Sequence, residues 1–179
     1  MNRQPIVDHI PALRRYARAL TGNTWAADDL VQDTLERACS KWRLWLAGSD
    51  LRAWLFTLMH NLFVNQVRSS VRHGQGNIVD IDDVAHELAA PDGNPGPSMD
   101  LQRCLMRLPA DQRTVLLLVT LEEMSYAEVA KITGVPIGTV MSRLSRARSR
   151  LQVLLDAPVV DAPAPVNSEN AAPMLRRLK

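Results

Sequence analysis

The chain has 179 residues, of which 46% are hydrophobic, and it carries 21 Lys and Arg against 19 Asp and Glu. This length allows one large domain or two small ones, and the hydrophobic content is enough for ordinary globular cores. No stretch approaches the ~20 apolar residues of a membrane-spanning helix, and the N-terminus lacks an apolar segment of signal-peptide length. We therefore expect a soluble, cytoplasmic protein without direct membrane insertion.

Opposite charges gather in different segments of the chain. Residues 1–73 carry ten Lys and Arg against six acids, and residues 101–155 carry eight against four. Between them, residues 74–100 carry six acids and no Lys or Arg. Two basic segments joined by an acidic one indicate a polyanionic partner that is contacted at two places.

Residues 5–73 are predicted to form a helical domain. The composition favours helices, because Ala, Leu, Arg, Glu, Asp and Gln are frequent while strand-favouring runs are few. Apolar side chains recur at helical spacing over residues 10–20. Gly22 is then expected to end this helix, and Thr24 to cap a second one at about residues 25–45.

The second predicted helix has an apolar stripe and an acidic polar face. In a domain that is otherwise basic, such a face repels nucleic acid and attracts a basic or amide-rich protein surface. It is therefore a candidate protein-docking face, and a merely solvated face is the alternative. The polar face carries Asp29, Gln32, Asp33 and Glu36.

After a loop at residues 47–50, a third helix is predicted at about residues 51–71. It mixes aromatic, amide and basic side chains, which is how proteins hold bases that have left a duplex. An aromatic stripe at helical spacing is more often core, and Trp54 and Phe56 are expected to be largely buried. The mixed set is Trp54, Phe56, His60, Asn61, Phe63, Asn65 and Arg68.

Two segments are predicted to lie outside the folded domains. Residues 74–98 contain repeated Gly and Pro and few large apolar side chains, which indicates a flexible acidic linker. A short amphipathic turn at residues 84–88 could still dock onto another surface. Residues 157–179 are rich in Pro and Ala and are expected to form a disordered tail.

A second helical domain is predicted over residues 99–156. Ser125 and Glu128 have the spacing of a capping box, in which each side chain bonds the other's backbone N–H. The short helix that follows is expected to end at Gly134. A longer helix is predicted at about residues 137–155. A short helix, a Gly-containing turn and a second amphipathic helix are together the pattern of a helix-turn-helix.

The last predicted helix separates an apolar stripe from a face of arginines and hydroxyls. Guanidinium groups bind phosphates or the acceptor pair of guanine, and hydroxyls bond phosphates or bases. This face therefore predicts binding in a DNA major groove, with a solvated basic face as the alternative. The face carries Thr139, Ser142, Arg143, Arg146, Ser149 and Arg150.

Several motifs, in this order and spacing, resemble the extracytoplasmic-function sigma factors of the sigma-70 family. The likeness covers about residues 10–155 and implies an all-α chain with a sigma-2-like domain and a helix-turn-helix sigma-4-like domain. The motifs are DDLVQDT at 28–34, LRAWLFT at 51–57 followed by Asn61, LPADQR at 108–113, SYAEVA at 125–130 and GTVMSRLSRAR at 138–148.

The resemblance assigns two surfaces to the first domain. A coiled coil of the largest subunit of core RNA polymerase would be bound through Asp29, Gln32, Asp33 and Glu36. The −10 promoter element would be read and opened by Asp50, Arg52, Asn61, Asn65 and Arg68. Family members often carry Asp at the position of Asn65, so the sequence departs from the family pattern there.

In the second domain, the resemblance implies that the last helix reads the −35 element. The acidic linker would thread the RNA-exit region of the polymerase, and an anti-sigma factor would clamp both domains in a stress-response circuit. The residues implied in −35 recognition are Thr139, Ser142, Arg143, Arg146 and Arg150.

Nothing in the sequence indicates catalysis. No nucleophile–base set, phosphate-binding Gly loop or metal-ligand cluster is visible, so we expect no enzyme activity, cofactor, metal or small-molecule substrate. The four His residues are scattered. Cys39 and Cys104 are interpreted as free thiols, with a redox-sensing pair as the alternative.

Two other functions are compatible with parts of the pattern. A helix-turn-helix repressor or activator would act without polymerase, but it leaves the acidic face of the second helix unexplained. A sigma-like decoy would bind only an anti-sigma protein, and it has no use for the basic face of the last helix.

Overall fold

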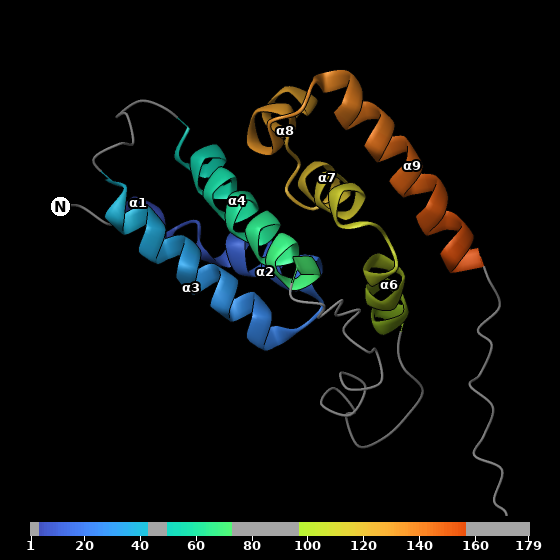
Figure 1. Ribbon diagram of the computed structural model, residues 1–179, viewed down its shortest axis with the longest axis horizontal. Coiled ribbons are helices and arrows are strands. Elements are labelled where there is room, and N and C mark those ends of the chain that lie inside the picture. The colour runs from blue at the N-terminus through green and yellow to red at the C-terminus, as the bar shows by residue number, and fades with distance from the viewer. Residues whose placement is uncertain (1–3, 43–49, 73–96, 157–179) are drawn as a thin grey trace, which may run out of the picture.

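The computed structural model describes residues 4–42, 50–72 and 97–156. Part of the predicted loop, residues 74–96 of the predicted linker with its amphipathic turn, and the predicted tail lie outside these residues. Residues 97 and 98, the last two of the predicted linker, begin a helix instead. The described residues form helices and no strand, as the all-α prediction requires (Figure 1). The helices are α1 (Gln4–Val7), α2 (Ile10–Thr21), α3 (Thr24–Ser40), α4 (Leu51–Arg72), α6 (Pro97–Met106), α7 (Ala110–Thr120), α8 (Tyr126–Thr133) and α9 (Ile137–Asp156).

Helices α2, α3 and α4 pack into the first domain, α3 lying against both α2 and α4. Gly22 ends α2 as predicted. Its φ of 72° lies in the left-handed region that glycine adopts without strain, and its N–H donates to the carbonyl of Arg18. The predicted cap at Thr24 was wrong. Asn23 has the extended backbone of an N-cap and accepts a hydrogen bond from the Ala26 N–H at 3.0 Å, whereas Thr24 is already helical.

Helix α3 ends at Ser40, earlier than the apolar spacing predicted. The Lys41 N–H donates to the carbonyls of Arg37 and Cys39, which closes the last turn. Apolar spacing could not locate this end, because Trp42 lies beyond it and still packs against the core.

The second domain is formed by α6 to α9, with α7 and α8 both against α9. The predicted capping box is present: the Ser125 N–H donates to the Glu128 carboxylate at 2.8 Å, and the Glu128 N–H donates to the Ser125 hydroxyl. Gly134 ends α8 with a φ of 68°. Val140, Leu144 and Ala147 of the apolar stripe of α9 are buried. The predicted helix-turn-helix is therefore confirmed as α8 and α9.

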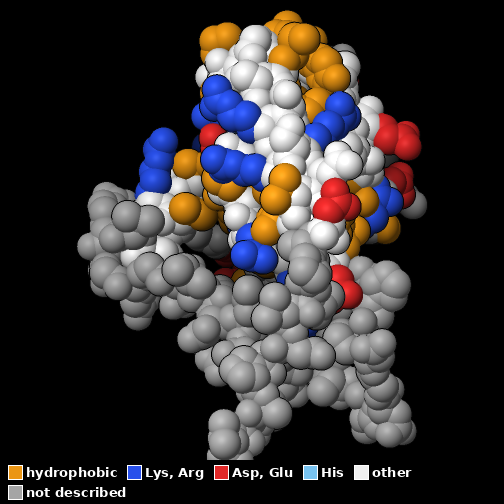
Figure 2. Space-filling model, turned by 90° about the vertical axis from the view of Figure 1, so that its right-hand side faces the viewer, with side chains coloured by type: hydrophobic (Ala, Val, Ile, Leu, Met, Phe, Trp, Pro, Cys, Tyr) orange, Lys and Arg blue, Asp and Glu red, His pale blue; other side chains and the backbone are white. Residues whose placement is uncertain are grey.

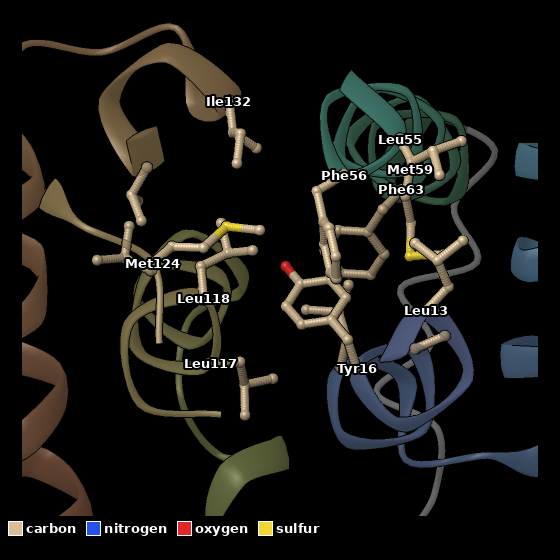
Figure 3. Packing of buried hydrophobic residues seen from close by; sticks show 14 of the residues in the cluster. Leu13, Tyr16, Leu55, Phe56, Met59, Phe63, Leu117, Leu118, Met124 and Ile132 are labelled. Carbon is tan, nitrogen blue, oxygen red and sulfur yellow. The ribbon is translucent and has the colours of Figure 1, made fainter. Parts of the chain in front are cut away.

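The two domains are docked against each other, and the contact surface between them is called the seam below. Helix α4 contacts α8, and α2 contacts α6 and α7 (Figure 1). Figure 3 shows Tyr16 and Phe56 reaching from the first domain toward apolar side chains of the second. Their rings meet edge to face with centroids 5.2 Å apart. The apolar residues shown opposite them are Leu117, Leu118, Met124 and Ile132.

The close approach of Gly22 to the second domain generates a stability prediction. A Cβ at Gly22 would lie 2.5 Å from the sulfur of Met106, whereas a Cβ at Gly134 meets nothing within 4 Å. Alanine costs about 1–2 kcal/mol at either left-handed position. Gly22→Ala should cost roughly 1 kcal/mol more than Gly134→Ala in urea unfolding, because Met106 must move. Equal losses, or an excess that persists in a Met106→Ala background, would contradict this account.

Candidate protein and nucleic-acid interfaces

The acidic face of α3 points away from the helices that pack against it. Asp29, Gln32 and Glu36 are exposed, and Asp33 is half-buried. The Gln32 amide donates to the Glu36 carboxylate at 3.1 Å, which holds the two side chains together. The buried stripe on the other side of α3 contains Leu30, Val31, Thr34 and Ala38. The four residues predicted to dock a protein thus form one open surface.

The five residues predicted to contact the −10 element do not form one surface. Asn61, Asn65 and Arg68 are exposed along α4. The Asp50 carboxylate accepts a hydrogen bond from the Ala53 N–H at 3.1 Å and so caps the start of the helix. The fifth residue, Arg52, is turned into the seam. As expected, Phe56 is buried, while Trp54 is half-buried against the core.

Arg52 meets a partner that the sequence analysis missed. Its Nη2 lies 2.8 Å from Oε2 of Glu122, in the turn between α7 and α8, and its guanidinium carbon lies 5.6 Å from the ring centre of Phe56. Arg15 binds the same carboxylate from α2. No local pattern could have shown this, because the pairing depends on how two separate domains dock.

On α9, the arginines predicted to bind DNA differ in their surroundings. Arg143 is half-buried, with its Nε 3.1 Å from the Asp111 carboxylate, and Arg150 donates to the Gln112 side-chain oxygen at 3.2 Å. Both partners belong to α7. Arg146 is exposed and pairs with no other described residue. Arg146 is therefore the arginine of this set that is most available to a ligand.

The hydroxyl positions of this face are also defined. Ser142 is half-buried and its hydroxyl donates to the Thr139 carbonyl at 3.0 Å, while Ser149 is exposed. Figure 2 shows Lys and Arg side chains spread over this side of the molecule, with apolar side chains gathered at one end.

This surface also has an apolar component that was not predicted from the sequence. Three large apolar side chains remain exposed here: Tyr126 at the start of α8, and Ile137 and Met141 near the start of α9. Met141 and Tyr126 line an open groove together with Leu144, Ser145, Arg148 and Ser149. An exposed Met at the start of a recognition helix suits contact with a thymine methyl group. The signal was present, since Met141 lies outside the apolar stripe, but it was not used.

Among the described residues, no group of three or more His, Cys, Asp or Glu is placed to hold a metal ion. No helix in the same part of the chain is long and apolar enough to cross a membrane. Cys39 is exposed and Cys104 is buried, and both are free thiols.

The two domains match family models in the order that their folds suggest. Residues 6–60 match the model described as the Sigma2 domain of PhyR, and residues 98–151 match Sigma-70, region 4. An N-terminal sigma-2 unit followed by a helix-turn-helix region 4 defines a protein of the sigma-70 class.

Full-length relatives narrow this class. The chain is 41% identical to the ECF RNA polymerase sigma factor EcfG of Rhodopseudomonas palustris over 86% of its own length and 84% of the relative's. It is 33% identical to SigM of Mycobacterium tuberculosis, another ECF sigma factor, over 82% of its own length and 73% of the length of SigM. The chain therefore belongs to the extracytoplasmic-function RNA polymerase sigma factors, as its motifs predicted.

A solved structure supports the same assignment. The sigma factor RpoE, in complex with the anti-sigma factor NepR from Bartonella quintana, aligns over 89% of this chain and 98% of its own, with 38% identity and a TM-score of 0.69.

His60 of α4 generates a pH prediction for the seam. Its Nδ1 is buried and has no hydrogen-bond partner among the residues that the structure describes. Burial, followed by the positive charge of Arg143, lowers the pKa of its imidazole below the ordinary 6.5. The native state therefore binds fewer protons than the unfolded chain below this pH. The free energy of unfolding should be unaffected by His60 well above pH 6.5 and should fall as the pH drops below that value, because the unfolded chain then takes up the proton more readily.

Urea unfolding at several pH values checks this, with His60→Gln as the comparison because it keeps a polar side chain of similar reach. The loss of stability on acidification should be smaller in the variant. If the free energies of unfolding of the two proteins fall equally between pH 7.5 and pH 5.5, protonation of His60 does not destabilise the folded chain.

Proposed function

We propose that this chain binds core RNA polymerase through α3 and directs initiation at promoters whose −35 and −10 elements its two domains read. The observation that carries the proposal is the separation of charge between two surfaces, the acidic face of α3 and the arginine-bearing face of α9. Opposite signs suit opposite partners, a basic protein surface in one case and DNA phosphates in the other. The chain acts in the cytoplasm and has no catalytic activity of its own.

Reading of the −35 element is centred on Arg146. An exposed guanidinium on a recognition helix can bond the O6 and N7 acceptors of guanine. Thr139, Ser142 and Ser149 supply hydroxyls beside it, and Met141 supplies an apolar contact. Because Arg143 and Arg150 are tied to α7, they set the angle of α9 and present their remaining N–H groups to phosphates.

Capture of the −10 element is assigned to the exposed side of α4. Asn61, Asn65 and Arg68 can bond base edges and phosphates of an unpaired strand. Capture of unpaired bases would offset the few kcal/mol of lost stacking. Each domain alone is small, and joining them on one polymerase raises affinity through effective concentration.

An anti-sigma protein is the proposed inhibitor of this chain, in a stress-response regulon. The supporting observation is the relative RpoE, whose structure contains the anti-sigma factor NepR. A decoy that binds only such an inhibitor is a poorer account, because the basic face of α9 is intact and exposed. A repressor that acts without polymerase leaves the acidic face of α3 without a partner.

Run-off transcription with core polymerase and a genomic promoter library tests the whole proposal. The chain should start transcripts from a defined set of promoters that core polymerase alone ignores. Protection of the same promoters without polymerase would favour the repressor instead.

Charge reversal on α3 should weaken binding of the chain to core polymerase. Asp33→Lys with Glu36→Lys places two cations where a basic surface docks, and the affinity for core polymerase should fall at least about tenfold. The control is Asp8→Lys with Glu123→Lys, which makes the same change of net charge at exposed positions elsewhere. Titration of labelled protein with core polymerase measures both, and equal losses would point to net charge rather than to α3.

Replacement of the α9 arginines should separate DNA contact from stability. Arg146→Ala should weaken binding to a −35 duplex by about 1–3 kcal/mol and leave the urea midpoint unchanged. Arg143→Ala should lower the midpoint slightly, because its ion pair with the exposed Asp111 contributes at most about 1 kcal/mol. Fluorescence anisotropy and urea unfolding of both variants decide the matter. The assignment fails if Arg146→Ala binds DNA as well as the unmodified chain does.

A further inference from the structure

The seam contains one carboxylate that is bound by both arginines facing it. The Glu122 carboxylate is fully buried. Its Oε1 accepts from Arg15 Nη2 at 2.9 Å and Nε at 3.2 Å, and its Oε2 accepts from Arg52 Nη2 at 2.8 Å. Arg52 also donates to the Glu122 carbonyl at 2.7 Å. Glu122 belongs to the second domain and both arginines to the first, so this cluster joins the domains.

The arginines stay in partial contact with water, with 55% of the Arg15 side chain and 35% of the Arg52 side chain exposed. When the domains separate, all three charged groups become hydrated. The attraction of a buried ion pair is largely offset by the hydration it gives up, but removing one partner leaves the other charges desolvated and unpaired in the docked state, which favours separation of the domains. Docking through it is therefore reversible and depends on all three groups.

Unsatisfied polar atoms mark the seam as a surface that opens. Among the described residues, His60 Nδ1 of α4 and Arg113 Nε of α7 are buried without a hydrogen-bond partner. Burial raises the pKa of the Tyr16 phenol and lowers those of His60 and Arg113. Native interiors leave few such atoms, since each costs free energy that water would relieve.

Promoter geometry requires the docked domains to separate. The names of the two elements place them about 25 base pairs apart, roughly 85 Å of duplex at 3.4 Å per pair. A compact body of this size is only about 40 Å across. The 24 residues between α4 and α6 can extend over at most about 80 Å. The two domains can therefore reach both elements only after the seam has opened.

We propose that Glu122 is an intramolecular latch, which holds the free chain closed by occupying Arg15 and Arg52 until polymerase and promoter binding open the seam. The closed chain keeps α9 outward but withholds Arg52 of the −10 helix from any other partner. The benefit of opening to promoter binding rests on the proposed function, whereas the latch itself is a property of the free chain.

Energy transfer between two dyes tests the latch. One dye is placed on the exposed Cys39 of α3 and the other on a cysteine introduced at the exposed Gln152 of α9, with Cys104→Ala to prevent a third label. Glu122→Gln keeps the shape of the side chain and removes its charge. It should raise the ratio of open to closed chains by about tenfold, seen as lower transfer efficiency, because charge-assisted bonds are lost.

Glu123→Gln is the matched control, since it removes the same charge from the exposed neighbouring residue and should leave the transfer efficiency unchanged. Arg15→Gln is the second test variant. Its side chain is more than half exposed, so it should fold even if Glu122→Gln does not, and it should also lower the efficiency. Circular dichroism of each variant confirms its helical content.

Two results would overturn the proposal that Glu122 is a latch. One is an unchanged transfer efficiency in the folded Glu122→Gln and Arg15→Gln variants. The other is a variant with lower transfer efficiency that binds core polymerase and promoter no more tightly than the unmodified chain, while the unmodified chain does start transcription. Run-off transcription by the unmodified chain tests the proposed function separately, because energy transfer in the free protein depends on neither polymerase nor promoter.

Discussion

The docking of two helical domains determines which side chains of this chain meet solvent. Helices α2 and α4 turn Tyr16, Phe56 and Arg52 toward the second domain, while α3 packs its apolar stripe against α2 and α4 and so points its acidic side outward. In the second domain, α7 and α8 occupy the seam, which leaves α9 on the outside (Figure 1). The acidic face of α3 thus follows from packing within the first domain, and the outer position of α9 follows from the seam.

Helices and their ends could be predicted from sequence because their signals are local. Apolar spacing, the glycines that end α2 and α8, and the capping box of α8 each involve residues a few positions apart. The wrong N-cap predicted for α3 is also a local matter. Asn23 and Thr24 are both favourable N-cap residues, and only the backbone angles distinguish them.

The seam could not be predicted, because its partners are far apart in the sequence and its residues are chemically ambiguous. Arg52, Phe56 and His60 repeat every four residues along α4, and the pattern suits nucleotide capture as well as a buried face. The same holds on α9. A helical wheel puts Arg143 and Arg146 on the polar side together, and only the position of α7 shows that one is held by Asp111 while the other is free.

The two domains contribute unequally to a closed chain, and this bears on specificity. Because α9 points outward while the seam is intact, a closed chain can already test a −35 element. The proposed −10 contact of Arg52 is withheld. The apparent affinity of the first domain for the −10 element then equals its intrinsic affinity multiplied by the fraction of chains that are open. Duplex DNA alone engages only α9 and so gives no free energy for opening. A partner that binds both domains in their separated positions does, which makes opening coincide with assembly on polymerase.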